Sequence, residues 1–188
     1  MNTTKRNKKK DFVFNPEEYD SNDGMLTTVW GPPLWHFLHT MSFNYPVHPT
    51  SRDKKNYKEF ILKLKFVLPC GKCRKNLKKN MKQLPFTSSC LENRHHFSKY
   101  IFDLHELINK MLHKKSNLTY EVVRDRYENF RSRCSNKTRR KNGKKSEKGC
   151  TEPLVGEKSK CVLQIVPNSK KCDSLQIDKQ CEKVRIIP

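Results

Sequence analysis

Apolar side chains recur at helical spacing through the centre of the chain, and this pattern predicts four helices and a shorter fifth. Pro32 and Pro33 suit the first turn of the first helix, and Tyr45-Pro46 ends it because proline disfavours a helical residue before it. The next three helices are expected over residues 57–67, 70–84 and 95–113. Thr119 is a suitable N-cap for the fifth. No segment alternates like a strand, so we expect an all-α four-helix bundle with a short fifth helix.

The composition changes after Cys134, where apolar residues thin out and Lys, Ser, Asn and Gly take over. Residues 135–149 form a low-complexity basic linker that cannot bury enough apolar surface to offset the entropy of ordering. We therefore expect three parts. These are a flexible N-terminal segment over 1–25, a helical domain over 26–134, and a largely disordered basic tail with four cysteines over 135–188.

The formal net charge is +21, from 40 Lys and Arg against 19 Asp and Glu. Such a chain binds anionic surfaces, including nucleic acid, without specificity, and the basic tail is the expected contact. The basic residues form no known nucleic-acid-reading motif. No stretch approaches the roughly 20 apolar residues of a membrane helix, and the charged N-terminus carries no secretory signal. Eight cysteines without an export signal favour redox or metal-binding roles over structural bridges.

The strongest chemical signal is a C-x-x-C motif formed by Cys70 and Cys73 at the expected start of a helix. Two cysteines at this spacing lie one turn apart and can form a disulfide. The helix dipole, Lys72 and Arg74 all stabilise a thiolate there, which disulfide exchange at neutral pH requires. Taken alone, the motif fits a redox pair and half of a zinc site equally well.

A zinc site would need four ligands. The helical region has no second C-x-x-C motif, so Cys90, His95 or His96 would have to complete the site. A thioredoxin-like arrangement needs a strand before the motif and a βαβ frame, and neither is present. The alternative to a redox protein is therefore a basic, cysteine-rich zinc module that binds nucleic acid.

A second group of residues favours the redox alternative. Trp35 and His39 lie one turn apart on the first helix, and His105 and Asn109 lie one turn apart on the fourth. Each pair alone is more simply explained by core or groove packing. Together with a C-x-x-C motif between them, in an all-helical frame, they form a known pattern.

This pattern resembles the Erv/ALR family of flavin-linked sulfhydryl oxidases, over about residues 28–133. The matched segments are Trp30-Gly31 through Trp35 and His39 to Tyr45-Pro46, His105 to Asn109 against H-N-x-V-N, Leu112-His113-Lys114 against L-G-K, and Arg126-Tyr127. Glu106 departs from the second position of H-N-x-V-N. The segment from Thr119 to Arg133 resembles members encoded by large cytoplasmic DNA viruses.

The resemblance implies an FAD-dependent thiol oxidase that forms disulfides in protein substrates, with O2 as acceptor and H2O2 as product. Cys73 would be the sulfur next to the flavin, and Cys70, expected to be more exposed, would exchange with incoming dithiols. No metal is expected. The implied FAD contacts are Gly31, Trp35, His39, Tyr45, His105, Asn109, Lys114, Arg126 and Tyr127.

The resemblance also implies a homodimer through the first two helices and, for a viral protein, action in the host cytoplasm or the virion. The structural disulfide usual in the family falls on Phe102 and Leu118, so we expect apolar packing in its place. Members often carry an extra cysteine pair on a flexible arm. Cys134 or a tail cysteine would act as such a relay only if folding brings two of them together; the alternative is a tail that tethers the enzyme to an anionic partner.

Overall fold

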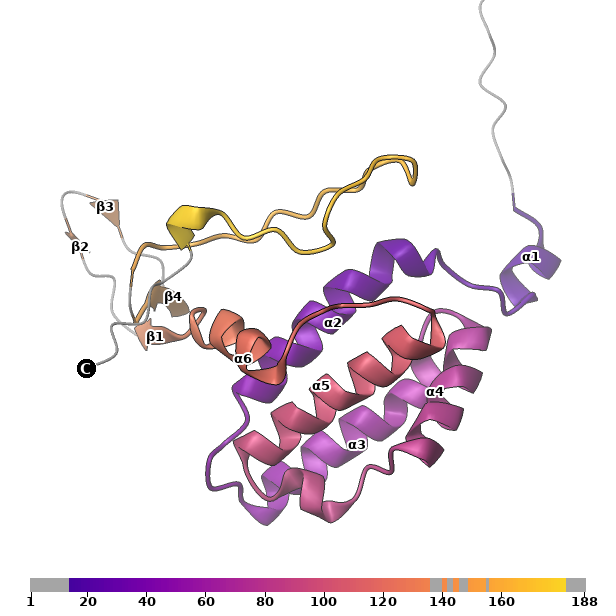
Figure 1. Cartoon of the computed structure of the whole chain (residues 1–188), viewed down its shortest axis with the longest axis horizontal. Coiled ribbons are helices and arrows are strands. Elements are labelled where there is room, and N and C mark those ends of the chain that lie inside the picture. The colour runs from indigo at the N-terminus through magenta and orange to yellow at the C-terminus, as the bar shows by residue number, and fades with distance from the viewer. Residues whose placement is uncertain (1–13, 136–139, 142–143, 146–148, 155, 182–188) are drawn as a thin grey trace, which may run out of the picture.

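The computed structural model describes residues 14–135, 140–141, 144–145, 149–154 and 156–181 (Figure 1). The helices are α1 (Pro16–Asp20), α2 (Thr27–Phe43), α3 (Ser51–Val67), α4 (Gly71–Gln83), α5 (Arg94–Met111) and α6 (Tyr120–Glu128), with 3-10 turns η1 (Ser88–Leu91) and η2 (Lys179–Cys181). The strands are β1 (Ser132–Ser135), β2 (Arg140–Lys141), β3 (Lys144–Lys145) and β4 (Gly149–Pro153).

Helices α2 to α5 form a bundle, and α6 packs against α2 beside it (Figure 1). The expected all-α bundle with a short fifth helix is therefore confirmed. Its main core contains Leu38, Tyr45, Ile61, Leu68, Leu77, Met81, Phe86, Leu91, Phe97, Tyr100, Ile101 and Leu104. A second cluster joins α6 to α2, and it contains Phe43, Tyr120, Val123 and Tyr127. Phe102 and Leu118 pack against this second cluster, which agrees with apolar packing at those two positions.

Polar caps fix where three of the helices begin. Thr50 and Asp53 form a capping box at the start of α3, which satisfies N–H groups that the first turn leaves without partners. Asn93 caps α5, and Thr119 caps α6 as the sequence predicted.

Within the described residues, none of the helices has the length and apolar run that crossing a bilayer requires.

Helix α2 begins at Thr27, five residues before the start that the two prolines indicated. Pro32 and Pro33 therefore lie inside the helix, where each removes one backbone hydrogen bond. Trp30 accounts for part of the extra length. Its ring packs against the main core, and its Nε1 donates to the Met25 carbonyl at 3.0 Å.

The start of the tail contains strands where we expected none. β1 pairs antiparallel with β4, in the register Ser132↔Pro153 and Arg133↔Glu152, and a disulfide joins Cys134 of β1 to Cys150 of β4. The disulfide restricts the unfolded chain, so less entropy is lost when the loop between the two strands closes. The sequence analysis missed these strands because hydrophobic periodicity does not reveal a disulfide. β2 and β3 form a second two-residue ladder, and most of the expected basic linker lies outside the described residues.

Candidate active site

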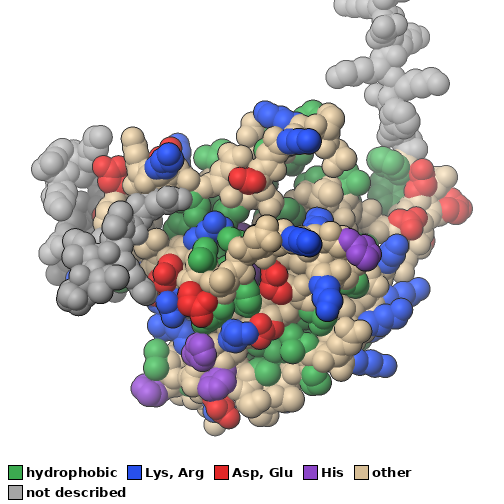
Figure 2. Space-filling view, in the orientation of Figure 1, with side chains coloured by type: hydrophobic (Ala, Val, Ile, Leu, Met, Phe, Trp, Pro, Cys, Tyr) green, Lys and Arg blue, Asp and Glu red, His purple; other side chains and the backbone are tan. Residues whose placement is uncertain are grey.

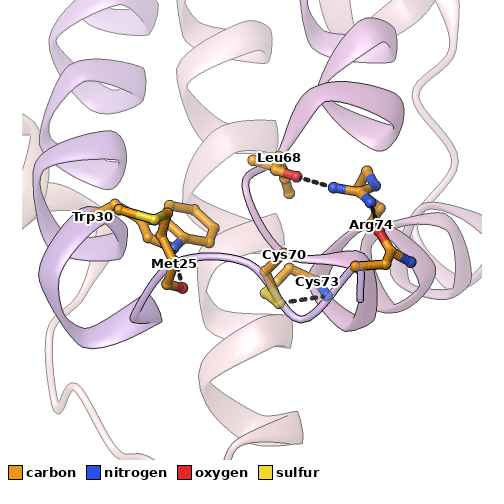
Figure 3. Close-up of a disulfide and its surroundings, with 7 residues drawn as sticks. Met25, Trp30, Leu68, Cys70, Cys73 and Arg74 are labelled. Carbon is orange, nitrogen blue, oxygen red and sulfur yellow. Dashed lines mark hydrogen bonds between the residues drawn. A yellow bond between two sulfur atoms is a disulfide. The ribbon is translucent and has the colours of Figure 1, made fainter. Parts of the chain in front are cut away.

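Cys70 and Cys73 form a disulfide at the start of α4, with their Cα atoms 5.1 Å apart (Figure 3). Cys70 is the N-cap residue of α4, and the Cys73 N–H donates to its Sγ at 3.1 Å. The first turn of a helix presents unpaired N–H groups and the positive end of the helix dipole. When the disulfide is reduced, both features stabilise a thiolate on Cys70. The geometry therefore fits thiol–disulfide exchange.

Residues 22–25, which we call the strap, lie over the cysteine pair. The Gly71 N–H donates to the Asn22 carbonyl at 3.0 Å, and the Met25 N–H donates to the Pro69 carbonyl at 2.8 Å. Figure 3 shows Met25 and Trp30 beside the pair, with the Arg74 guanidinium donating to the Leu68 carbonyl. Arg74 also donates to the Asn22 side chain, so it links the loop before α4 to the strap.

The strap changes the expected exposure of the two cysteines. Cys70 is only 7% exposed, whereas Cys73 is partly exposed. The expectation that Cys70 is the more exposed sulfur is therefore wrong in this conformation. Part of the N-terminal segment that we expected to be flexible covers it: residues 14–25 contain α1 and the strap. A bulky dithiol needs the strap to move before it reaches Cys70.

Gly24→Ala should loosen the strap. Gly24 has φ +84°, and an added Cβ would lie 2.8 Å from the Cys70 Cα and closer still to the Pro69 carbonyl. A left-handed alanine costs about 1–2 kcal/mol, which corresponds to a roughly 5- to 30-fold shift toward the open strap. We expect iodoacetamide to label Cys70 of the reduced protein faster by that factor, measured by peptide mass spectrometry. Gly31→Ala is the control, because its Cβ meets nothing within 4 Å. Equal rates in both variants would show that the strap does not limit access.

Four of the predicted cofactor residues come together where α2, α5 and α6 meet. The Trp35 ring stacks on the His105 ring with centroids 3.9 Å apart and planes 6° apart. His39 Nε2 lies 3.0 Å from His105 Nδ1, within hydrogen-bonding distance. The His39 ring also stacks on Tyr127, with centroids 5.2 Å apart. These four residues form the aromatic cluster.

Burial keeps both histidines of the cluster neutral. Burial, with smaller contributions from His105 and His36, lowers the pKa of His39 to about 3. Burial also lowers the pKa of His105 to about 4; Glu106 opposes that shift and Lys114 adds to it. Each neutral ring has one donor nitrogen and one acceptor nitrogen. Among the described residues, His39 Nδ1 is buried with no hydrogen-bond partner.

That unpaired nitrogen bears on whether the cluster fits the flavin that the resemblance implies. A buried polar atom without a partner costs about 1–3 kcal/mol, so such atoms are rare unless a ligand or water satisfies them. His39 Nδ1 is such an atom, and it lies among the ring faces of Trp35, His105 and Tyr127. Flat aromatic faces next to one unsatisfied polar atom suit a planar heteroaromatic ring. The residues present therefore fit a flavin.

Three other predicted contacts lie near the end of α5 or on α6. Asn109 Nδ2 donates to Glu106 Oε1 at 3.0 Å, so the residue that departs from the family motif holds the amide. Lys114 is exposed just beyond α5, and its N–H donates to the Asn109 carbonyl at 2.9 Å. Arg126 is partly buried beside Tyr127 on α6. These positions suit contacts with a charged or polar extension of a ring ligand.

Two predicted contacts have no such placement. Tyr45 is fully buried in the main core, where its hydroxyl donates to the Leu91 carbonyl at 3.0 Å and its ring packs against Tyr57 and Phe97. The bundle alone accounts for that residue. An added Cβ at Gly31 meets nothing within 4 Å, so protein packing does not require glycine there.

His36 was missed by the sequence analysis. Its Nδ1 lies 3.3 Å from the Tyr127 hydroxyl, and burial lowers its pKa. The available signal was its spacing, since residue 36 precedes His39 by three positions and so shares a helix face with it.

A zinc site finds no support in the described part of the chain. No group of three or more His, Cys, Asp or Glu side chains there gathers closely enough to hold a metal ion. Cys90, one of the three side chains that would have to complete such a site, is a free thiol, and its polar contacts are Thr87 Oγ1 at 3.6 Å and the Pro85 carbonyl at 3.8 Å.

Comparison with known proteins matches residues 32–128 to the model of the Erv1 / Alr family. A protein named "probable FAD-linked sulfhydryl oxidase" from Acanthamoeba polyphaga mimivirus is 38% identical over 96 residues, covering 51% of this chain and 66% of the relative. The chain thus spans just under two thirds of that relative. An FAD-linked sulfhydryl oxidase of African swine fever virus is 31% identical over 86 residues, covering 46% of this chain and 70% of the relative. The crystal structure of the FAD binding domain of Erv1 from Saccharomyces cerevisiae is 25% identical, with a TM-score of 0.47, covering 52% of this chain and 89% of that one.

Proposed function

The chain belongs to the Erv1 / Alr family, and on that premise we propose that it is an FAD-linked thiol oxidase that forms disulfides in protein substrates. The observation that carries the proposal is the disulfide between Cys70 and Cys73 at the start of α4, inside the family match. The names of the viral relatives support the same activity. The balanced reaction is 2 R-SH + O2 → R-S-S-R + H2O2.

The cysteine pair does the exchange chemistry. A substrate thiolate attacks Cys70 Sγ, which forms a mixed disulfide and releases Cys73 as a thiolate. The second substrate thiol then attacks the mixed disulfide, releasing Cys70 and leaving the substrate oxidised. The pair has now gained two electrons and two protons. The helix N-terminus stabilises each thiolate as it forms. When bound, FAD would supply the acceptor for these two electrons and their route to O2.

The aromatic cluster is the proposed flavin site. Trp35 and Tyr127 offer stacking faces, and His39 Nδ1 offers the hydrogen-bonding atom that the protein leaves unpaired. His105 holds His39 in place through the 3.0 Å contact between their ring nitrogens. Lys114 and Arg126 are the proposed diphosphate contacts, because their cationic side chains suit phosphate oxygens.

Three finer features belong to the same proposal. The enzyme forms a homodimer through α2 and α3, where Phe37 and Phe60 are 51% and 39% exposed and their ring centroids lie 6.1 Å apart. It acts in the host cytoplasm or the virion, in keeping with the viral relatives. The basic tail makes nonspecific contacts with nucleic acid or another anionic surface.

An absorbance spectrum of the purified protein tests the function. We expect a yellow protein with flavin bands, about one flavin and no stoichiometric zinc per chain, and dithiothreitol-dependent O2 consumption with release of H2O2. Trp35→Ala should lose flavin, because it removes one stacking face, whereas Phe14→Ala at an exposed site should retain it. A colourless protein that contains zinc would refute the proposal and favour the zinc module.

A further inference from the structure

The segment around the cysteine pair carries positive charge only. Between Phe60 and Leu91 the chain has eight Lys or Arg residues and no Asp or Glu, whereas the whole chain has about two basic residues for each acidic one. The eight are Lys63, Lys65, Lys72, Arg74, Lys75, Lys78, Lys79 and Lys82. Chain-wide proportions would place about four acidic residues here, so their absence is a local feature and does not follow from the net charge.

Most of this charge lies on one side of α4. Lys72, Lys75, Lys79 and Lys82 are exposed and spaced three, four and three residues apart, so they share a helix face that we call the lysine face. Figure 2 shows Lys and Arg side chains along the edge of the molecule formed by α4. Within the described residues, none of these four lysines forms an ion pair.

Exposed apolar side chains border the same entrance. Met25 ends the strap and Leu26 follows it, and they are 70% and 73% exposed. Phe66 and Val67 precede Cys70 and are 59% and 66% exposed. The bond from the Met25 N–H to the Pro69 carbonyl brings the two groups together in space. Lys78 Nζ lies 4.8 Å from the centre of the Phe66 ring, which joins the apolar rim to the charge on α4.

A protein substrate must therefore lay its cysteine-bearing segment on a surface that is apolar at the cysteine pair and cationic along α4. A small neutral dithiol needs no such contact. We propose that the substrates are reduced proteins whose cysteine pair lies in an acidic segment with an apolar residue, docked on the lysine face. This inference rests on the proposed oxidase function and adds the substrate class.

The test compares dithiol peptides that are identical except for flanking Glu or Lys residues, with dithiothreitol as a neutral reference. Charge complementarity raises association rates by 10- to 1000-fold at low salt and is screened over about 8 Å at physiological salt. We expect kcat/KM for the acidic peptide to exceed that for the basic peptide by roughly 10-fold or more at low salt. The gap should close at high salt, and dithiothreitol oxidation should change little.

Two triple variants with equal changes in net charge distinguish an effect of the lysine face from an effect of the total charge of the protein. Lys75→Glu, Lys79→Glu and Lys82→Glu should remove the preference for the acidic peptide. Lys160→Glu, Lys170→Glu and Lys171→Glu, at exposed tail positions, should keep it. Equal kcat/KM for the two peptides, or equal losses in both variants, would overturn the inference. The inference would also be overturned if the α4 triple variant lost binding of a single-stranded oligonucleotide but kept its preference for the acidic peptide.

Failure of the oxidase function remains distinguishable from failure of the docking surface. Binding of a labelled acidic peptide with serine in place of both cysteines is measured by fluorescence anisotropy, which needs no turnover. Salt-sensitive binding that the α4 triple variant loses supports the lysine face even when dithiothreitol is not oxidised. No binding by a protein that oxidises dithiothreitol rejects the lysine face alone.

Discussion

Dithiol oxidation is expected to fall to background in Cys73→Ser, measured as dithiothreitol-dependent O2 consumption. Turnover needs a disulfide that can open and re-form, and Cys70 forms its disulfide with Cys73. Cys70→Ser should cause the same loss, because it removes the sulfur at the helix N-terminus. Cys90→Ser is the matched control. Cys90 is a free thiol with only weak polar contacts, so its loss should leave activity close to that of the parent.

The two inactive variants should differ in their spectra. If Cys73 is the sulfur next to the flavin, as the family resemblance implies, the remaining Cys73 thiolate of Cys70→Ser should give a long-wavelength absorbance band. Cys73→Ser should lack that band. If the band occurred in Cys73→Ser instead, the roles of the two sulfurs would be exchanged. Activity retained by either variant would refute the exchange mechanism itself.

Acidification should destabilise the bundle through the buried histidines. The folded-state pKa values are about 3 for His39 and about 4 for His105, against 6.5 for an unperturbed imidazole. Above pH 6.5 both rings are neutral in the folded and unfolded states and contribute no pH dependence. Below pH 6.5 the unfolded chain binds protons that the folded chain does not. The free energy of unfolding should therefore fall by about 1.4 kcal/mol per pH unit for each ring, down to about pH 4.

Urea unfolding at pH values between 7 and 4.5, followed by circular dichroism, measures this slope. His39→Gln with His105→Gln should flatten it, since the two buried imidazoles are gone. His96→Gln, which removes an imidazole from an exposed site, is the matched control for loss of a histidine. An identical pH dependence in the parent and the double variant would show that other groups cause the acid destabilisation.

The helices were predictable because their signals are local. The apolar spacing of α3 and α5, the cap at Thr119 and the C-x-x-C motif lie within short windows of sequence. The aromatic cluster was predictable only in part. The spacing from Trp35 to His39 places both rings on one face of α2, but the 3.0 Å contact with His105 depends on how α2 and α5 pack. Resemblance to a family implied that both histidines contact the cofactor, but it did not predict the contact between their rings.

The exposure of Cys70 was predicted wrongly for a related reason. The strap that covers it lies 45 or more residues earlier in the sequence, and its hold on Pro69 and Gly71 is made by backbone groups. Backbone hydrogen bonds leave little trace in residue type. Asn22 and Gly24, both residue types that tolerate the positive φ they adopt here, were the local signs. The burial of Tyr45 was not predicted either: its motif suggested a ligand contact, whereas its depth in the core depends on Tyr57 and Phe97.

The prolines inside α2 bear on the energetics of substrate access. Proline has no backbone N–H, so the carbonyls of Thr28 and Val29 lose the donors that positions 32 and 33 would supply. Two consecutive rungs of the ladder are missing, so the first turn of α2 is held to the rest of the helix by fewer backbone bonds than in an unbroken helix. Trp30 links this turn to the strap through Met25, and its ring packs against the main core. Opening the strap together with this turn has to release the Trp30 ring but not the whole bundle, so we expect its free energy to lie below that of unfolding the bundle.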